Sequence, residues 1–299
     1  MNTIPQAQQN ELQLTRLAAQ RSLYSHAKIV YAWQVILSVV GVVVWSILVA
    51  SYSKLAPYAA LWGIVITFLD ILLLTPWQQS FKEKAAKIQE LFDCDVLQMD
   101  WRELKAGSRL ETETVERYAT KYKRKDPKYA ALQEWYPESV GRVSLPLGRI
   151  ICQRANCWWD ADLRRHYAKL VVAFLIILTV SVSCFGFIGG FTLEKFVLAA
   201  INPLMPVFVL GIRQCKEHIE SAARLDKLKD HTGKLWDKAL KNEIPKELAH
   251  DSRDLQDEIY NHRRTNPLIF DWLYGRLRTG NEALMNKAAD ELVEEAIRR

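Results

Sequence analysis

Residues 31–52 read YAWQVILSVVGVVVWSILVASY and contain no formal charge. A bilayer core about 30 Å thick needs about 20 apolar residues in a helix, so this segment is long enough to cross it. Tyr31 and Trp33 near one end, and Tyr52 at the other, suit the interfacial belts in which aromatic side chains gather. The segment therefore predicts a transmembrane helix.

Three more apolar segments follow: 58–77 (YAALWGIVITFLDILLLTPW), 170–191 (LVVAFLIILTVSVSCFGFIGGF) and 196–212 (FVLAAINPLMPVFVLGI). Short links join the first to the second and the third to the fourth, which favours two helical hairpins. The fourth segment is near the short limit and contains Pro203 and Pro206, so we expect it to be kinked or partly re-entrant. The predicted fold class is mainly α: a polytopic membrane protein with four transmembrane helices in two hairpins and a mostly helical cytoplasmic region.

The composition conceals this segregation. Mean hydropathy is −0.09 and charged residues make up 25% of the chain, yet the apolar residues are concentrated in two blocks. A net charge of +6 fits a protein that faces anionic lipid or an anionic ligand, and it is weak evidence for binding a DNA or RNA polymer. Five cysteines without the spacing of a secreted disulfide framework indicate reduced thiols. About thirty polar residues precede the first span, far more than an ordinary signal-peptide n-region, so we expect that span to be retained.

Orientation follows from the positive charges. The two short links carry only Lys54 and the pair Glu194–Lys195, whereas the other flanks are basic. The basic flanking residues are Arg16, Arg21, Lys28, Lys82, Lys84, Lys87, Arg164, Arg165, Lys169, Arg213 and Lys216. The positive-inside rule then predicts that both termini and the middle segment are cytoplasmic.

Five regions result from this reading. They are an N-terminal helix (1–30), hairpin 1 (31–77), a cytoplasmic middle region (78–169), hairpin 2 (170–212) and a helical tail (213–299). Within them, helical spacing predicts helices over 80–92, 146–168, 214–241 and 245–260, whereas partial alternation over 91–101 favours a short strand.

Asp70 is the most unusual residue in the spans, because a carboxylate deep in a bilayer costs several kcal/mol unless it is paired, protonated or facing water. It is either a pore-lining or gating acid or an interfacial acid paired with a neighbouring Lys or Ser hydroxyl. Asn202 and Pro203 weaken the regularity of the fourth span and are the other candidates for a conducting path or gate. Packing between helices is the more common role of such breaks, and of the glycines in the third span.

The segment 149–166 (RIICQRANCWWDADLRRH) is the densest polar and aromatic cluster. Arg154, Trp158, Asp162 and Arg165 recur at helical spacing and share a face. Arginine with tryptophan can bind phosphates and stack on bases. From the residues alone, a membrane-proximal helix with anchoring tryptophans and snorkelling arginines explains the same pattern better.

Catalytic and metal-binding signatures are missing from the sequence. It contains no Walker loop, G-x-S-x-G elbow or H-E-x-x-H pair. Cys152, Cys157 and His166 match neither the spacing nor the ligand number of a zinc site. We therefore expect no catalytic residues, no metal and no enzyme.

Several phrases together resemble a known family. They are Ile4-Pro5 with Gln9-Asn10, RLAAQR (16–21), LFDCDV (91–96), WYP (135–137) and CQRANCWWD (152–160). They look like the SMODS-associated four-transmembrane (S-4TM) family of pore-forming effectors in bacterial antiphage systems. The resemblance runs from the N-terminus to the flank of the third span and is less distinct in the tail.

The resemblance implies an inner-membrane effector encoded beside a nucleotide-cyclising polymerase, governed by a cyclic di- or oligonucleotide and impairing the membrane to halt phage spread. Under that hypothesis Arg154, Trp158, Trp159, Arg164 and Arg165 would contact the cyclic nucleotide, and no other cofactor is expected. Since four spans enclose too little room for a wide pore, a homo-oligomer in lipid is expected. The alternative is a membrane-anchored scaffold or adaptor whose cytoplasmic helices bind a protein. A lipid hydrolase built on Asp70 would need a second acid or histidine that the spans do not offer.

Overall fold

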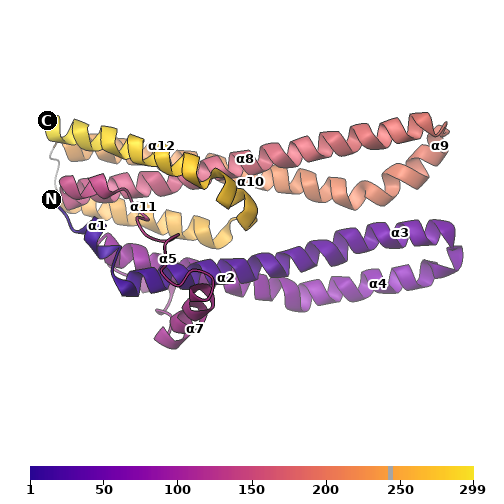
Figure 1. Ribbon diagram of the computed structural model, residues 1–299, viewed down its shortest axis with the longest axis horizontal. Helices are drawn as coiled ribbons and strands as arrows, with labels where there is room; N and C mark the ends of the chain where they lie inside the picture. The colour runs from indigo at the N-terminus through magenta and orange to yellow at the C-terminus, as the bar shows by residue number, and fades with distance from the viewer. Residues whose placement is uncertain (242–244) are drawn as a thin grey trace. The chain divides into compact units, whose positions relative to one another are not determined.

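The computed structural model describes residues 1–241 and 245–299, and all regular structure within these ranges is helical (Figure 1). This confirms the mainly α class. The chain forms two compact units. The first comprises Met1–His26, Phe81–Leu163 and Ser221–Arg299, and the second comprises Ala27–Ser80 and Arg164–Glu220.

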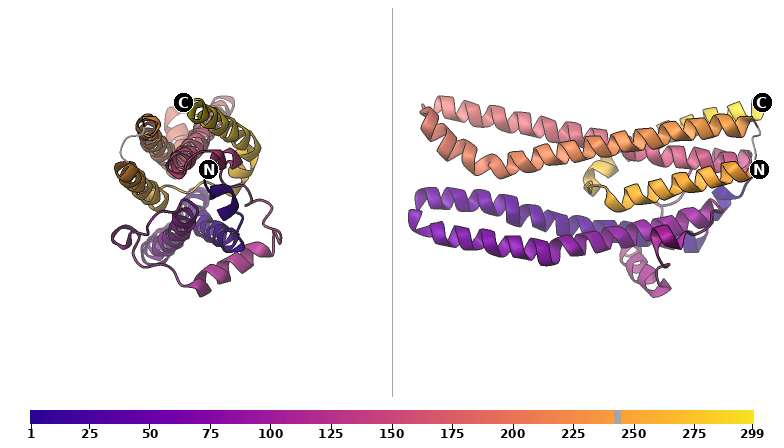
Figure 2. Two further views of the ribbon diagram at one scale, coloured as in Figure 1. Left: turned by 90° about the vertical axis from the view of Figure 1, so that its left-hand side faces the viewer. Right: turned by 180° about the vertical axis from the view of Figure 1, so that it is seen from behind.

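The second unit contains the apolar segments. The helices of its first hairpin are α2 (Glu11–Val35), a π-helix (Ile36–Val40), α3 (Gly41–Ser51), a 3₁₀ link (Ser53–Leu55), α4 (Ala56–Leu69), a second π-helix (Asp70–Leu74) and the start of α5 (Thr75–Val96). Figure 2 shows α3 and α4 side by side and antiparallel. Trp62 of α4 packs against Gly41, where an added Cβ would lie 3.0 Å from the indole Nε1, so the small residue permits the close approach.

The second hairpin consists of α8 (Leu145–Ile188), α9 (Leu193–Phe196), a third π-helix (Val197–Ile201) and α10 (Asn202–Leu240). Gly190 ends α8 with φ +61°, a conformation that glycine adopts without strain. A Cβ on Gly211 would lie 2.8 Å from Leu175 Cδ2, so here too glycine lets two helices pack closely. Pro206 lies inside α10, and the helix continues through it.

Within the described residues, three helical stretches are long and apolar enough to cross a membrane: Glu11–Val49, Ser53–Val96 and Leu145–Ile188. The second contains the predicted span 58–77, and the other two contain all but the last three residues of the predicted spans 31–52 and 170–191. The fourth span, and with it the full topology, stays a prediction.

The first unit packs around one apolar core. Its remaining helices are α1 (Ile4–Ala7), α6 (Glu103–Ala106), α7 (Thr112–Lys123), a 3₁₀ turn (Glu138–Arg142), α11 (Pro245–Thr265) and α12 (Asp271–Arg298). Leu17, Phe92, Ile151, Leu235 and Val293 are all buried in this core. The ends of α5, α8 and α10 therefore share a hydrophobic centre with α2, α11 and α12.

The strand predicted over 91–101 is wrong. The helix α5 continues to Val96, because Ile88, Phe92 and Val96 recur at helical spacing and all lie in the core. The chain then reverses at Gln98, whose φ is +53°. The helices predicted over 80–92, 146–168, 214–241 and 245–260 are confirmed wherever the structure describes them, and residues 242–244 of the tail lie outside the described residues.

Candidate functional site

A small hollow lies in the first unit between α8 and α12. Its volume is about 220 Å³. It is lined by Ile151, Arg154, Ala155 and Trp158 of α8, and by Leu284, Met285, Ala288 and Ala289 of α12. Ligand pockets usually measure about 300–1,000 Å³, so this hollow is smaller than a usual ligand pocket, and Arg154 is its one charged lining residue.

The hollow brings together two of the five residues predicted to contact a nucleotide. Arg154 and Trp158 are four residues apart on α8, so they face the same side. Trp159 packs instead against Tyr274 of α12, with ring centroids 6.1 Å apart.

The other two predicted residues belong to the second unit. Arg164 is buried, and its Nη1 lies 3.4 Å from His218 Nδ1. The ring of Tyr167 packs on the same histidine, with centroids 4.3 Å apart. Arg165 is half-buried. The five side chains therefore have different environments, although they lie on one helix.

Asp70 has neutral hydrogen-bond donors around it. Gln34 Nε2 of α2 donates to Asp70 Oδ1 at 2.7 Å and also approaches Thr75 Oγ1 at 3.1 Å. The Thr75 hydroxyl lies 3.3 Å from the same carboxylate oxygen. Asp70 also begins the π-helix that separates α4 from α5. Single π-turns inside α-helices are often found at functional sites.

The other two gate candidates lie at the start of α10. Asn202 is exposed and directly follows the π-helix Val197–Ile201, and Pro203 is half-buried. An exposed amide on an apolar helix needs a polar partner, either from another copy of the chain or from water.

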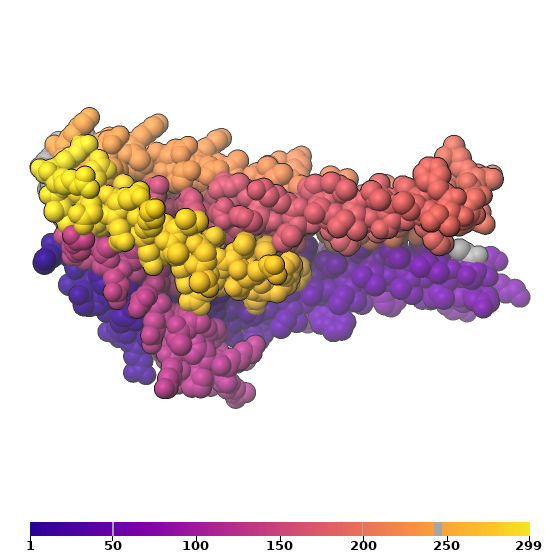
Figure 3. All heavy atoms as spheres, turned by 45° about the horizontal axis from the view of Figure 1, so that its top comes forward, coloured from indigo at the N-terminus to yellow at the C-terminus, as the bar shows by residue number. Residues whose placement is uncertain are grey.

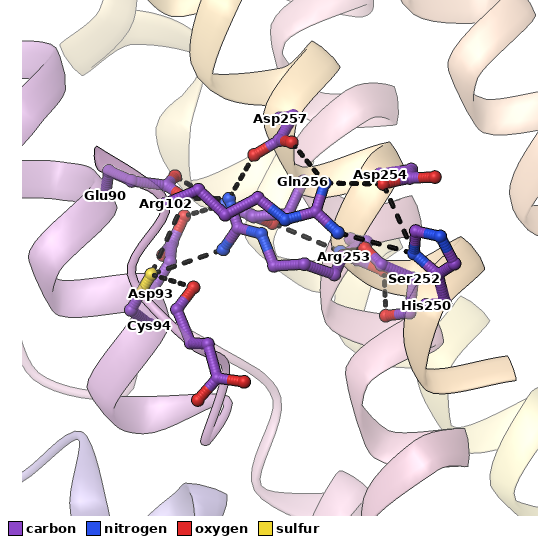
Figure 4. A network of polar contacts seen from close by, with 12 residues as sticks. Glu90, Asp93, Cys94, Arg102, His250, Ser252, Arg253, Asp254, Gln256 and Asp257 are labelled. Atoms are coloured by element: carbon purple, nitrogen blue, oxygen red, sulfur yellow. Dashed lines mark hydrogen bonds and ion pairs between the residues drawn. The ribbon is translucent and has the colours of Figure 1, made fainter. Parts of the chain in front are cut away.

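A buried polar network joins α5 to α11 in the first unit (Figure 4). Arg253 Nη2 donates to Glu90 Oε1 and to Asp257 Oδ1, each at 2.6 Å. Gln256 Nε2 donates to Glu90 Oε2 and to Asp93 Oδ2, each at 2.9 Å. The three carboxylate residues are almost fully buried, with 1% of Glu90, 0% of Asp93 and 4% of Asp257 exposed.

Further residues complete the network at both ends. Arg263 Nη1 pairs with Asp93 Oδ2 at 2.5 Å, and the hydroxyl of Tyr136 donates to Asp93 Oδ1 at 2.6 Å. Arg102, which is more exposed, reaches Asp257 Oδ2 at 2.7 Å and Asp254 Oδ1 at 2.5 Å. Acidic side chains and arginines thus alternate across the contact between α5 and α11.

The electrostatics follow from this burial. Desolvation raises the pKa of Glu90, the neighbouring charge of Asp93 raises it further, and Arg253 opposes both effects. Desolvation lowers the pKa of Arg253, but Glu90 and Asp257 outweigh it, so the net shift is upward. Burial also raises the pKa of Cys94, which makes its thiol a poor nucleophile.

The network pairs its buried carboxylates internally, although Arg253 Nε and Arg263 Nη2 are enclosed without a hydrogen-bond partner among the described residues, and it is suited to holding α5 and α11 together. Among the described residues, no group of three or more His, Cys, Asp or Glu side chains could hold a metal ion. Sequence reasoning missed this network. One available signal was an arginine four residues before an aspartate on a predicted helix (Arg253, Asp257). The other was two carboxylates three residues apart (Glu90, Asp93), but the wrong strand prediction over 91–101 separated Asp93 from the helix of Glu90.

Comparison with known proteins identifies the family. Residues 2–292 match the model of the SMODS-associating 4TM effector domain, so the chain belongs to this family. A protein of Bacillus cereus (strain VD146) described as a probable CBASS effector molecule is 24% identical over 274 residues, covering 89% of this chain and 90% of the relative. No solved structure matches the chain. The predicted resemblance is thereby confirmed.

Proposed function

We propose that this SMODS-associating 4TM effector is an antiphage effector of the bacterial inner membrane that a cyclic oligonucleotide controls. Its family and its CBASS-effector relative support the defence role. Its apolar helices support a membrane location. When released or activated, several copies form a pore or disrupt the membrane, and growth stops.

One observation carries the control mechanism. The helix α8 is continuous over 44 residues, and it carries both Arg154 and Trp158 and the apolar third span. A ligand that fills the hollow would press on α8 and α12 together. A rigid helix is able to transmit that displacement along its length to the span.

The conducting path is assigned to polar groups of the second unit. Asp70, with Gln34, places a carboxylate and an amide among apolar side chains. Asn202 and Pro203 follow a π-helix at the other hairpin. In an oligomer, rings of such polar side chains would line a path for ions. The basic flanks of the spans support cytoplasmic termini, where the ligand is made.

Membrane integrity in living cells tests this proposal. Uptake of a membrane-impermeant dye is measured in cells that express the chain with and without its companion polymerase, before and after phage challenge. Dye uptake that depends on polymerase activity is expected. Membranes that stay intact under every condition would contradict the proposal.

Calorimetry on the detergent-solubilised protein with a panel of cyclic dinucleotides separates an effector from an adaptor. A nucleotide-controlled effector gives binding heat with one member of the panel. An adaptor that docks a protein gives none, and its polymerase-dependent dye uptake would also be absent.

A further inference from the structure

Arg21 of α2 is half-buried in the first unit among aromatic rings from other segments. Its guanidinium carbon lies 4.0 Å from the ring centroid of Tyr274 on α12 and 5.7 Å from that of Trp135. The other neighbour of Tyr274 is Trp159 of α8, with centroids 6.1 Å apart. Tyr274 and Trp135 therefore lie against the cation, and Trp159 packs on the Tyr274 ring. We call Arg21, Trp135, Trp159 and Tyr274 the Arg21 cluster.

The positive charge of Arg21 is not neutralised by the chain. Arg21 makes no ion pair and no hydrogen bond with any residue that the structure describes, and its Nε is shut off from solvent without a partner. By contrast, Arg253 and Arg263 of the same unit are paired with buried carboxylates. A half-buried cation that lacks a carboxylate is costly, and aromatic faces offset only part of that cost.

The rest of the guanidinium remains available. The two terminal nitrogens of Arg21 bond to no described residue. Unlike Nε, they are not fully enclosed, so they reach solvent. Figure 3 shows α12 at the surface of the first unit. The planar guanidinium fork matches the oxygens of a phosphate.

A second cation lies close by. Arg278 is one turn after Tyr274 on α12 and pairs with Glu282 at 2.5 Å. Burial raises the pKa of Tyr122 on α7, and both Arg21 and Arg278 oppose this shift, so both guanidinium groups act on the same phenol. Arg278 is thus neutralised by Glu282, whereas Arg21, the one cation of the cluster, has no carboxylate partner among the described residues.

We propose that the Arg21 cluster is a binding site for a phosphodiester, in which Arg21 holds the phosphate and the neighbouring rings contact the base. Base–aromatic contacts and arginine–phosphate pairs are the two recurrent elements of nucleotide recognition. The inference rests on the proposed control by a cyclic oligonucleotide and adds the Arg21 cluster to the hollow between α8 and α12 as a candidate contact for that ligand. A phosphate of an anionic lipid offers the same chemistry and is the second possible source.

Substitution of Arg21 tests the site against a matched control. Arg21→Gln removes the free cation, whereas Arg276→Gln removes an equal charge from an exposed position two residues after Tyr274. Affinities of the full-length protein in detergent are measured for cyclic di-AMP, cyclic di-GMP, cyclic GMP–AMP and a cyclic triadenylate, and separately for phosphatidylglycerol vesicles. Circular dichroism confirms that each variant keeps its helical content.

For the probe that binds the wild type, Arg21→Gln is expected to raise Kd about 10- to 100-fold, since hydrogen bonds to charged groups contribute about 1.5–3 kcal/mol. Arg276→Gln is expected to change it less than about twofold. Arg21→Lys keeps the charge but loses the planar fork, so a loss of affinity between those of the other two variants is expected. If Arg21→Gln does not fold, the affinity of Arg21→Lys tests the site instead.

The other outcomes are distinct. A nucleotide that binds the wild type and Arg21→Gln equally overturns the Arg21 cluster and leaves nucleotide control intact. Arg21-dependent binding of the vesicles alone keeps phosphate recognition, with lipid as its source, and removes nucleotide control. If no probe binds the wild type, both proposals fail.

Discussion

Replacing Arg253 by methionine should destabilise the protein strongly, because it removes the cation between two buried acids. Glu90 and Asp257 each accept a hydrogen bond from Arg253 Nη2 at 2.6 Å, and 1% and 4% of these residues are exposed. Methionine fills much of the volume of the arginine side chain, so the change acts mainly on charge. Glu90 and Asp257 keep other partners, Gln256 and Arg102, but lose their shared one.

The expected magnitude follows from the general behaviour of such pairs. Removing one partner of a buried ion pair costs about 3–5 kcal/mol, because the other charge is left uncompensated. Asp257 keeps its ion pair with Arg102, whereas Glu90 keeps only the neutral Gln256, so Glu90 is the charge left uncompensated. At about 2–4 °C per kcal/mol for a large domain, the melting temperature should fall by roughly 6–20 °C.

Thermal and urea unfolding of the detergent-solubilised protein, followed by far-ultraviolet circular dichroism, measures the effect. The matched control is Arg299→Met, which breaks an exposed pair with Glu295 at 3.1 Å and should cost at most about 1 kcal/mol. The double variant Arg253→Met with Glu90→Gln should recover part of the loss, because the second change removes one uncompensated charge.

The pH dependence gives a second check. Arg253 holds the pKa of Glu90 down against burial and Asp93, so its removal raises that pKa further. Protonation of Glu90 then removes the unpaired charge, and the deficit of Arg253→Met should shrink as the pH is lowered from 8 to 5. If Arg253→Met unfolds within about 1 kcal/mol of the wild type at pH 7, the network does not hold α5 and α11 together, and the reasoning is refuted.

Three further changes test other parts of the structure. Glu90→Gln should flatten the pH dependence of stability. Because the pKa of Glu90 is raised in the folded protein, the stability that Glu90 contributes falls as the pH rises from its unfolded pKa of about 4.3 towards its folded pKa. Unfolding curves between pH 4 and 8 measure this slope. Gly211→Ile should lower the free energy of unfolding by about 1–3 kcal/mol, because the added Cβ would lie 2.8 Å from Leu175 Cδ2. The control is Gly280→Ile, whose added Cβ has nothing within 4 Å, so thermal unfolding of this variant reports the change in helix propensity alone. Trp158→Ala should weaken nucleotide binding about 5- to 150-fold if a base stacks in the hollow, and calorimetry that shows unchanged affinity would exclude that role.

The three apolar helices of membrane-spanning length and the other long helices could be predicted because run length and helical spacing are local properties. The segment 91–101 fits both a strand and a helix by its local pattern, and the strand prediction was wrong. Phe92 and Val96 pack in the core, which favours the helix. Asp70 stood out as an acid in an apolar segment, but its partner Gln34 depends on how the two helices of a hairpin are paired. A single amide within 31–52 carries no signal of that pairing.

The nucleotide candidates show the same limit. Helical spacing placed Arg154 and Trp158 on one face, and the structure adds the residues of α12 that close the hollow. Spacing along one helix does not reveal that Trp159 meets Tyr274, more than a hundred residues later, or that Arg21 lies over the same ring. These contacts are set by the packing of the core, which brings α2, α8 and α12 together.

The buried network explains how α11 finds a single position on α5. Apolar contacts tolerate small shifts, because one aliphatic side chain can replace another against the same surface. A shift of α11 by one residue would instead part Arg253 from Glu90 and Arg263 from Asp93, and would leave charges buried without partners. Buried ion pairs add little net stability, yet they penalise every alternative register. A ligand that separates Arg253 or Arg263 from its acid would therefore change the most strongly specified contact of the first unit.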